Sequence, residues 1–395
     1  MSNNDAKSAD VIIVGGGPAG SSAAYMLARQ GLHVLVLEKQ KMPRYKTCGG
    51  GVNIRAARHI PFSIEPVIEK TIYKYRFTYR GEKPFEKAYD EPLTYMTQRL
   101  RLDQFLLDQA CEQGAQVIEE ASIRKIAVND DAVTVEDADG KTYRSLVLIG
   151  ADGANSIVAR QLQLSDGVQR EIALESEVSL PAEIMARWAD TIELDLFSVW
   201  CGYGWIFPKK DHISIGVGGP QKLIKQIKAY NTAYLSQNAV AEYPTIRFSG
   251  HALPVRKGFS PLTKGRALLV GDAAGLLEPF TGEGIGYAVR SGQLAARAIE
   301  AFLKNEAADL TLYTHLLDQE LTPELLSARQ FVQIFNRFPA LFYHLIKNND
   351  YVWGAICKIL RGERNFNDIN RKLGFFKYAL PLLSTSATPG SARMS

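Results

Sequence analysis

The sequence predicts an α/β (α+β) fold in which a Rossmann-like nucleotide-binding domain is interleaved with an antiparallel sheet and followed by C-terminal helices. Three observations predict it. A strand, a glycine-rich turn, a helix and a second strand follow one another between residues 10 and 39. Alternating apolar and polar residues, typical of antiparallel strands, recur in 71–94 and 166–254. Beyond residue 306 the apolar residues recur at helical spacing.

The opening segment contains three glycines, Gly15, Gly17 and Gly20, spaced G-x-G-x-x-G after the buried strand 11–14. The first glycine permits a tight turn, the second leaves room for a pyrophosphate, and the third lets helix and strand pack closely. Phosphates favour the N-terminus of such a helix, here around Ala19, because its free N–H groups and dipole attract an anion. This segment therefore predicts a dinucleotide site.

The second strand, 34–37, ends at an acidic residue, Glu38, 18 residues beyond Gly20. A carboxylate at this place can accept hydrogen bonds from the adenosine ribose hydroxyls, and Lys39 follows it within the same predicted site. Because an acid disfavours a 2′-phosphate, the expected ligand is FAD or NAD, and not NADP.

Composition narrows the class of protein. The chain has 395 residues and a net charge of +4, which gives no case for nucleic acid and leaves open a weak attraction to anionic membranes. No apolar run is long enough to cross a bilayer. The first ten residues lack an apolar signal core, so a cytoplasmic protein is expected. The four cysteines form no C-x-x-C pair, and no metal site or disulfide framework is predicted.

The domain boundaries follow from these patterns. We expect a discontinuous nucleotide-binding domain formed by 1–70, 95–165 and 255–305. The antiparallel sheet, 71–94 and 166–254, would wall a substrate cavity. A helical region is expected over 306–383. The polar tail 384–395, rich in Pro, Gly and Ser, is predicted to be disordered.

The loop 39–51 contains Cys48 directly before the glycines Gly49 and Gly50. Successive glycines indicate a close approach of the backbone to another group. Two interpretations stay open from the residues alone. Cys48 is either an inert small residue or a thiol beside a cofactor ring, where neighbouring Arg44 and Lys46 would favour its thiolate.

A second strand–glycine–helix segment spans 265–292. Asp272 follows the strand 267–270, and Gly282, Gly284 and Ile285 precede or begin a helix. Asp272 either holds ribityl hydroxyls or caps a turn. The helix would aim its N-terminus at a flavin pyrimidine ring and stabilise the reduced, anionic flavin by about 1 kcal/mol. Because only one complete dinucleotide fingerprint occurs, the sequence favours a resident FAD with a reductant that visits transiently.

Four motifs in order resemble the para-hydroxybenzoate-hydroxylase-type flavoproteins. They are the opening fingerprint, Arg99 in R-x-x-L-x-x-x-L, the segment Asp152-Gly153-x-x-Ser156, and Gly271-Asp272. Three further segments make the chain similar to the geranylgeranyl reductase family: K-T-C-G-G-G at 46–51, Y-G-W-I-F-P at 203–208 and P-F-T-G-E-G-I at 279–285. The resemblance covers roughly residues 10–370.

The resemblance implies roles for individual residues. Arg99 would lie against the flavin, and Cys48, Gly49 and Gly50 would lie near the isoalloxazine. Tyr203 and Trp205 would line a prenyl cavity, although ordinary sheet core is the alternative for both aromatic residues.

The implied reaction is the reduction of isolated C=C bonds in a prenyl chain carried by a lipid, quinone or tetrapyrrole. Reduced FAD would deliver hydride, and a proton would come from Cys48, Glu283 or the flavin itself. Glu283 is otherwise a solvated carboxylate at a helix N-terminus. NADPH or reduced ferredoxin would supply the electrons.

Rival classes remain open. The first is an aromatic monooxygenase or halogenase-like enzyme using NAD(P)H, although the halogenase segment W-x-W-x-I-P is absent. The others are a lycopene-cyclase-like enzyme without net redox change and a non-enzymatic flavin-binding protein. The C-terminal helices and the apolar run 378–383 are either peripheral membrane contacts or packed core. The sequence leaves the oligomeric state open.

Overall fold

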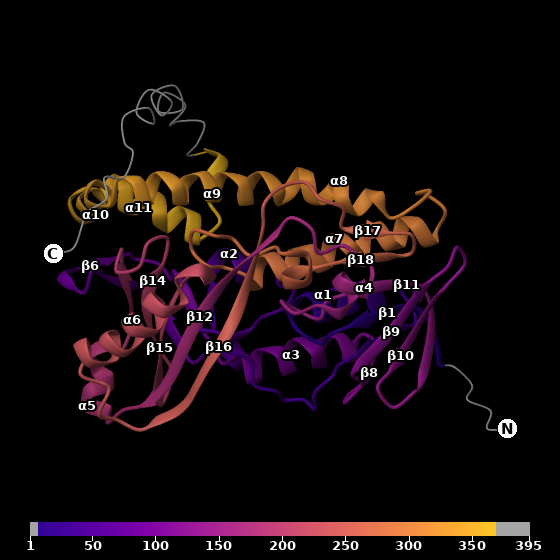
Figure 1. Cartoon of the computed structure of the whole chain (residues 1–395), viewed down its shortest axis with the longest axis horizontal. Coiled ribbons are helices and arrows are strands. Elements are labelled where there is room, and N and C mark those ends of the chain that lie inside the picture. Colours follow the sequence, from indigo (N-terminus) through magenta and orange to yellow (C-terminus); the bar gives the residue numbers. More distant parts are fainter. Residues whose placement is uncertain (1–6, 369–395) are drawn as a thin grey trace.

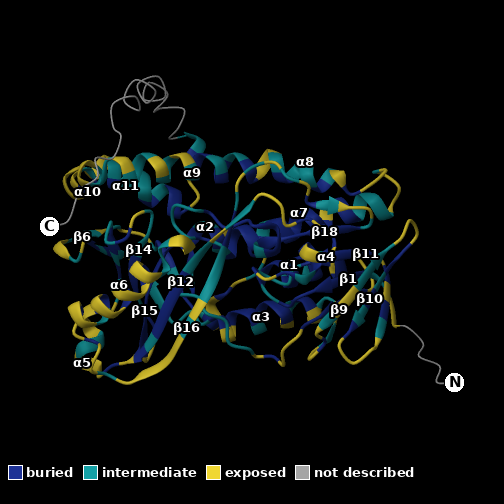
Figure 2. Ribbon diagram, viewed as in Figure 1, coloured by how far each residue is buried: buried dark blue, intermediate teal, exposed yellow. Residues whose placement is uncertain are grey.

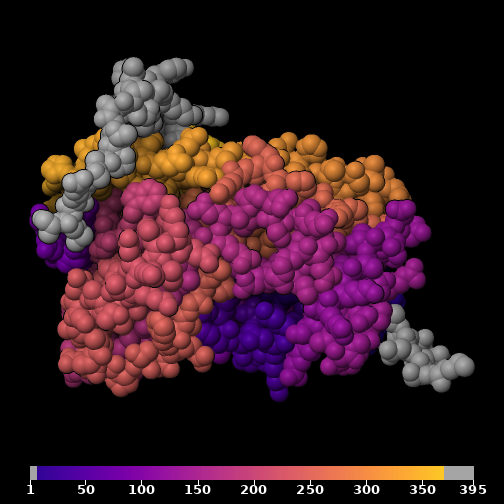
Figure 3. All heavy atoms as spheres, viewed as in Figure 1, coloured from indigo at the N-terminus to yellow at the C-terminus, as the bar shows by residue number. Residues whose placement is uncertain are grey.

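The computed structural model describes residues 7–368. Two β-sheet halves lie side by side, and helices from the C-terminal quarter run along one side of both (Figure 1). Buried residues concentrate in the strands of each half, and many exposed ones lie on outer helices and loop ends (Figure 2). Figure 3 shows a hollow between the halves in which N-terminal residues, in indigo, reach the surface. We call the two parts the nucleotide half and the sheet half.

An eight-stranded sheet forms the nucleotide half. Its order is β17-β18-β11-β1-β2-β8, and β10 and β9 extend from β11. The central strands are parallel, and residues 11–14 and 34–37 are fully buried, as expected for a parallel sheet that is covered on both faces. The strands are β1 (Lys7–Val14), β2 (Val34–Leu37), β8 (Gln116–Ile118), β9 (Ile123–Val128), β10 (Val133–Asp137), β11 (Thr142–Gly150), β17 (Thr263–Lys264) and β18 (Ala267–Leu269).

The helices of this half bring its two glycine segments together. Helix α1 packs against both α3 and α7. A Cβ atom at Gly292 of α7 would lie 2.3 Å from the carbonyl oxygen of Ala19 in α1. The two backbones can approach this closely because Gly292 has no side chain. The helices are α1 (Pro18–Arg29), α3 (Arg99–Glu112), α4 (Ile157–Gln161), the 3₁₀ turn η4 (Gly271–Ala274) and α7 (Ile285–Leu303).

A seven-stranded sheet of order β16-β12-β15-β14-β13-β5-β6 forms the sheet half. Its neighbouring strands are antiparallel, as predicted, except β5 and β13, which run parallel. A parallel pair needs a long crossover, and the whole segment between residues 79 and 191 supplies one. The strands are β5 (Lys74–Tyr79), β6 (Glu82–Ala88), β12 (Val168–Ser179), β13 (Thr191–Leu196), β14 (Tyr203–Pro208), β15 (His212–Pro220) and β16 (Thr245–Arg256).

One face of this sheet packs against α6, a helix inside the range that the sequence predicted to be strands. The segment folds as a helix because Ile227 and Tyr234, seven residues apart, fall on one helical face and are both buried. They meet Ile206, Ile213 and Val217 of the sheet. The helices are α5 (Ala182–Met185), η2 (Ala186–Trp188), η3 (Gln221–Leu223) and α6 (Ile224–Gln237).

A small three-stranded sheet, β3-β7-β4, joins the glycine loop 49–51 to the start of α3. Its central strand β7 pairs antiparallel with both neighbours. The elements are β3 (Gly51–Asn53), α2 (Ile54–His59), η1 (Glu65–Val67), β4 (Lys70–Ile72) and β7 (Thr94–Met96).

The C-terminal quarter is helical over its described part. A helix break falls at Pro339, where the ring prevents α9 from continuing. Its aromatic residues gather in one cluster, in which Phe335 packs against Phe342 and Phe280. No helix within residues 7–368 has the length and apolarity needed to cross a membrane. The run 378–383 and the tail 384–395 lie outside the described residues. The helices are α8 (Thr311–Glu320), α9 (Thr322–Arg337), α10 (Pro339–Asn348) and α11 (Asp350–Leu360).

Candidate functional site

The opening glycines are held in conformations and contacts that other residues would not tolerate. Gly15 has φ +106°, and a Cβ atom there would lie 2.4 Å from the carbonyl oxygen of Ala151. A Cβ atom at Gly20 would lie 2.0 Å from the carbonyl oxygen of Gly15. The turn and the start of α1 are therefore pressed against the sheet, as their spacing predicts.

Gly17 is different, because the space beside it is open to a ligand. A Cβ atom there would meet only Arg44 Nη2, at 3.4 Å. Gly17 is the N-cap of α1, which has no side-chain cap and no acid in its first turn. Free N–H groups, the helix dipole and an adjacent guanidinium suit a pyrophosphate. These residues thus fit the phosphates of FAD.

Glu38 lies at the end of β2 and is 3% exposed. Its carboxylate accepts hydrogen bonds from the backbone N–H groups of Gly16 at 2.8 Å and Gln40 at 3.1 Å. Arg44 Nε lies 3.5 Å away. The next residue, Lys39, is exposed. Glu38 therefore sits beside the glycine turn, and its role as the ribose ligand stays a prediction.

A chain of charges continues from this position to Cys48. Arg44 reaches Asp103 at 3.2 Å, and Arg99 binds the same carboxylate through two hydrogen bonds of 2.6 and 2.8 Å. Arg99 is 6% exposed and lies beside Cys48. Asp103 is thus a positioning residue for both arginines. Asp103 was not predicted as a site residue, although the four-residue spacing from Arg99 on a helix is the signal of such a pair.

The loop with Cys48 is wedged between both halves. Gly50 has φ +65°, and a Cβ atom there would lie 2.0 Å from the carbonyl oxygen of Thr97. A Cβ atom at Gly49 would lie 2.5 Å from the Phe207 ring. Lys209 Nζ donates hydrogen bonds to the carbonyl oxygens of Gly49 and Thr97 and fixes the loop on the sheet half.

Asp272 lies in η4 and faces the same loop, because its carboxylate is 3.8 Å from Lys46 Nζ. Lys46 also lies 3.2 Å from the ring of His251 on β16. Burial, together with the nearby Arg99 guanidinium, lowers the pKa of Lys46. Burial and the Lys46 ammonium lower the pKa of His251 to about 4, so this histidine is neutral at neutral pH.

The second glycine segment is braced from within. Glu278 is fully buried and accepts hydrogen bonds from the backbone N–H and the hydroxyl of Thr281. Gly282 has φ +72°, and Tyr203 Oη donates to the carbonyl oxygen of Thr281 at 2.9 Å. Gly284 is the N-cap of α7, which begins at Ile285 without a side-chain cap. The uncapped helix start is therefore available to a ligand.

Glu283 is an anchored residue and is not solvated, being 9% exposed. Its Oε2 atom accepts hydrogen bonds of 2.8 Å from both Arg55 Nη2 and Asn53 Nδ2, whereas Oε1 has no partner. Arg55 also reaches Glu324 of α9 at 3.2 Å. This ion pair ties the start of α7 to the segment after the Cys48 loop.

Tyr203 and Trp205 project from one face of β14 with Phe207, and their ring centroids are 5.9 Å apart. The Trp205 indole lies flat over β15, because a Cβ atom at Gly216 would come within 2.2 Å of it. A Cβ atom at Gly218 would lie 3.6 Å from the same indole. The central ring of the row therefore rests on glycines, and Trp205 and Phe207 face the glycine loop at 49–51.

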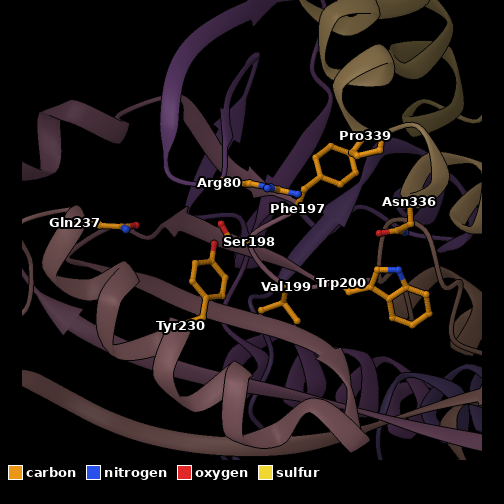
Figure 4. A pocket seen from close by; sticks show the side chains of 9 residues that line it. All are labelled: Arg80, Phe197, Ser198, Val199, Trp200, Tyr230, Gln237, Asn336 and Pro339. Carbon is orange, nitrogen blue, oxygen red and sulfur yellow. The ribbon is translucent and has the colours of Figure 1, made fainter. Parts of the chain in front are cut away.

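A separate half-open cavity of about 510 Å³ lies where β13 and β14 are connected (Figure 4). It contains none of the residues predicted for the site. Phe197 in the cavity wall stacks on Phe335, with ring centroids 4.7 Å apart. Phe335 in turn packs against Phe280 of the second glycine segment, with ring centroids 5.2 Å apart. Aromatic side chains thus connect this cavity with that segment. It is lined by Arg80, Phe197, Ser198, Val199, Trp200, Tyr230, Gln237, Asn336 and Pro339.

Two buried charged residues beside the Cys48 loop were not predicted: Glu175 and Lys209, which are 1% and 2% exposed. Glu175 alternates with apolar Leu174 along β12, a pattern that normally marks a solvent-facing position. Among residues 7–368, no group of three or more histidine, cysteine, aspartate or glutamate side chains could hold a metal ion. All four cysteines are free.

Two glycine segments, an acid at the end of β2 and the arginines beside it define a flavoprotein, and residues 8–201 match the FAD binding domain family. Geranylgeranyl diphosphate reductase of Rhodobacter capsulatus is 32% identical over 322 residues, covering 77% of this chain and 78% of that protein. The chain therefore belongs to the geranylgeranyl reductase family and is an FAD-dependent oxidoreductase. Menaquinone reductase of Mycobacterium tuberculosis is 30% identical over 320 residues, covering 74% and 77%.

Solved structures share the fold. A geranylgeranyl bacteriochlorophyll reductase-like protein of Thermoplasma acidophilum superposes with a TM-score of 0.74 at 21% identity, covering 84% of this chain and 88% of that one. A flavin-dependent brominase superposes with a TM-score of 0.73 at 20% identity, covering 90% and 94%. Because reductase-like and halogenating proteins share this fold, the residues of the site must distinguish them.

Proposed function

We propose that this protein reduces isolated C=C bonds of a geranylgeranyl or related prenyl chain, using hydride from reduced FAD. The observation that carries the proposal is the aromatic row Tyr203–Trp205–Phe207. Its Trp205 indole lies on glycines of β15, and Trp205 and Phe207 face the Cys48 loop. An isoprenoid chain is long, apolar and unbranched apart from methyl groups, and a flat aromatic surface suits it.

The residues of the nucleotide half would hold FAD. Gly17 and the start of α1 would take the pyrophosphate with Arg44, and Glu38 would take the adenosine ribose. Asp272 would bind the ribityl chain, and the α7 N-terminus at Gly284 would stabilise negative charge on the reduced ring. Once reduced, bound FAD supplies the hydride.

The sheet half would position the alkene and keep water away from it. An unactivated double bond needs a dry site and a placed acid. Cys48 lies next to Arg99, and Glu283 is held by Arg55 and Asn53. Both residues are candidate acids. The Oε2 atom of Glu283 already accepts two hydrogen bonds, so only its Oε1 atom is free to carry a proton.

The donor, the head group and the location belong to the same proposal. The reductant is a transient partner, NADPH or reduced ferredoxin, because one dinucleotide fingerprint serves the resident FAD alone. A quinone, a diphosphate, a tetrapyrrole or a glycerolipid could carry the prenyl chain, and similarity to a menaquinone reductase supports the quinone.

We propose a cytoplasmic protein that contacts the membrane peripherally through its C-terminal helices, where Leu341 of α10 is exposed.

The experiment is to purify the holoprotein, record its visible spectrum and identify any bound lipid by mass spectrometry. Anaerobic reduction with NADPH or with reduced ferredoxin, followed by prenyl substrates with different head groups, should give products heavier by two hydrogens per saturated bond. Oxygen-dependent NADPH consumption with a phenol would favour a monooxygenase, and turnover without net reduction would favour a cyclase. A colourless protein that takes up no flavin would overturn the whole assignment.

Cys48→Ala tests the loop residue. The variant should keep FAD, because Lys209 holds the loop through the carbonyl oxygens of Gly49 and Thr97 without the Cys48 thiol, yet lose prenyl turnover. Cys111→Ala, an exposed thiol on α3, is the matched control. Unchanged turnover in Cys48→Ala would remove this thiol from the reaction.

A further inference from the structure

Glu175 is a buried acid whose side-chain oxygens both lack a hydrogen-bond partner. It is 1% exposed on β12. Asp195 and Glu278, two other buried carboxylates, are well satisfied: Asp195 accepts hydrogen bonds from Thr78 and the Gly81 N–H, and Glu278 from Thr281. Glu283 lacks a partner on one oxygen only, whereas Glu175 lacks one on both. A buried polar group without partners costs stability, so its presence requires an explanation.

The strand register places Glu175 on the face that carries the aromatic row. Glu175 pairs with Gly216 of β15, and Gly216 pairs with Trp205 of β14. Neighbouring strands point opposed side chains to the same face, and the glycine between them has no side chain to separate acid from indole. On the other side Glu175 pairs with Ser249 of β16, whose hydroxyl accepts a 2.9 Å hydrogen bond from Thr47.

The surroundings of Glu175 suit an acid that is neutral before reaction and charged after it. Burial raises the pKa of Glu175 to about 7, and Lys209 opposes this rise most strongly. The Ser214 hydroxyl and the Cys48 N–H also lower the pKa of Glu175, although neither forms a hydrogen bond with its carboxylate. Glu177 raises that pKa. Other titratable or charged groups of the surrounding elements are Tyr45, Lys46, Arg247 and His251.

We propose that Glu175 is the proton donor for alkene reduction at this site. The proposal rests on the proposed function and deepens it. The π bond breaks, one carbon takes a hydride with its two electrons from reduced flavin, and the other carbon takes the proton of the Glu175 carboxylic acid. Glu175 is left as a carboxylate, stabilised by the Lys209 ammonium, and regains a proton from solvent between turnovers.

The other buried glutamates near the site are less suited by their contacts. Glu283 is held as an ion pair by Arg55 at 2.8 Å, so its carboxylate is already engaged. Glu278 uses its oxygens to brace its own loop. Among Glu175, Glu278 and Glu283, only Glu175 has no hydrogen bond or ion pair that losing or gaining a proton would break.

The first test reads protonation directly and does not depend on turnover. Infrared difference spectra of wild type minus Glu175→Gln, recorded on the holoprotein across pH 5–9, should contain a carboxylic acid C=O band that disappears near pH 7. Glu177→Gln is the matched control, because it lies two residues along the same strand face and is only half-buried. A difference spectrum without that band at pH 6 would overturn the proposal.

The second test separates the two half-reactions. The reduced holoenzyme is mixed with geranylgeranyl diphosphate and its reoxidation is followed. Glu175→Gln should keep its FAD and its rate of reduction but reoxidise about 100-fold more slowly, a typical effect of losing a general acid. The wild-type rate should fall above pH 7, and that of Glu175→Gln should not. Glu177→Gln should keep the wild-type maximal rate and a fall with pH, moved to lower pH because Glu177 raises the pKa of Glu175.

The outcomes distinguish this proposal from the function on which it rests. An active wild type together with a Glu175→Gln variant of equal rate and equal pH profile overturns only the donor role. A wild type that reduces no prenyl substrate of any head group overturns the proposed function, and the donor role with it. Recovery of a pH-dependent rate in Glu175→Asp, with its shorter acid, would support the donor role.

Discussion

On the face of the seven-stranded sheet that packs against α6, the buried carboxylates are fully hydrogen-bonded, whereas Glu175 on the opposite face has no partner. Asp195 accepts from Thr78, the Gly81 N–H, Ser198 and Tyr230, and Glu193 accepts from Trp188 and Tyr234. Buried carboxylates of one sheet are thus hydrogen-bonded on one face and left without partners on the other.

Side-chain size differs between the two faces as well. Along β15, Ile213, Ile215 and Val217 fill the α6 face, and the alternate positions Ser214, Gly216 and Gly218 leave the other face nearly bare. Close packing stabilises the first face. The second face lacks such packing and carries an aromatic surface and an unpaired acid instead. Under the proposed function, one face serves folding and the other serves the reaction.

The largest expected effect is on the α6 face. Ile215→Ala removes a side chain that is 1% exposed in the core, and it should lower the free energy of unfolding by about 2–5 kcal/mol. Turnover per folded molecule should stay near that of wild type. Denaturant unfolding and turnover of the remaining folded protein measure the two quantities. Lost turnover without lost stability would contradict the division between the faces.

Glu175→Gln should change how stability depends on pH. The folded-state pKa is raised from 4.5 to about 7, so the contribution of Glu175 is fully present below pH 4.5 and is lost as the pH rises through 7. At about 1.4 kcal/mol per pKa unit, wild type should lose about 2–3 kcal/mol more than the variant between pH 5 and pH 8. Urea unfolding at both values measures this. Parallel curves would show that the folded protein holds Glu175 ionised.

Gly216→Ala should damage the aromatic row. The new methyl group would lie 2.2 Å from the Trp205 indole and 2.6 Å from the carbonyl oxygen of Leu174, so the indole must move. Prenyl turnover should fall at least about tenfold, since a positioned substrate is sensitive to displacements of about 1 Å, and FAD content should not change. Gly218→Ala, with 3.6 Å of space, is the control. Equal turnover in both variants would contradict a substrate role for Trp205.

The smallest effect is expected for Ser214→Ala. The Ser214 hydroxyl lowers the pKa of Glu175, so its loss should move the infrared titration of Glu175 to higher pH. It also removes a 3.4 Å hydrogen bond from Trp205 Nε1, which is worth about 1 kcal/mol or less. An unchanged titration would show that the hydroxyl turns away from the acid.

Local motifs allowed much of the nucleotide half to be predicted from sequence. The roles of Gly15 and Gly20 follow from the turn itself, and a strand, a glycine loop and a helix recur around Asp272 in the structure as in the pattern. These features depend on neighbours within a few residues, so one sequence contains them. The bridge from Arg44 to Asp103 depends on packing between distant segments, and only the structure reveals it.

The sheet half was harder to predict for a physical reason. Alternating polar and apolar residues along β12 indicate which side chains share a face of the sheet, but not whether other parts of the protein cover both faces. Glu175 therefore had the sequence pattern of a solvent-exposed residue. Helix α6 was missed inside a range of strands, although Ile227 and Tyr234 have helical spacing. The roles of Tyr203 and Trp205 remain predictions, and the structure adds the glycines on which the indole lies.

The ion pairs of Arg55 have a consequence for biosynthesis. Arg55 joins Glu283 and Glu324, so residues from the first, third and last quarters of the chain meet at one guanidinium. A polypeptide emerging from the ribosome presents its opening glycine turn early, but Arg55 lacks its second acidic partner until Glu324 has been made. Contacts so distant in sequence form slowly. The two ion pairs of Arg55 are therefore late products of folding, and no nascent chain that stops before Glu324 can contain both.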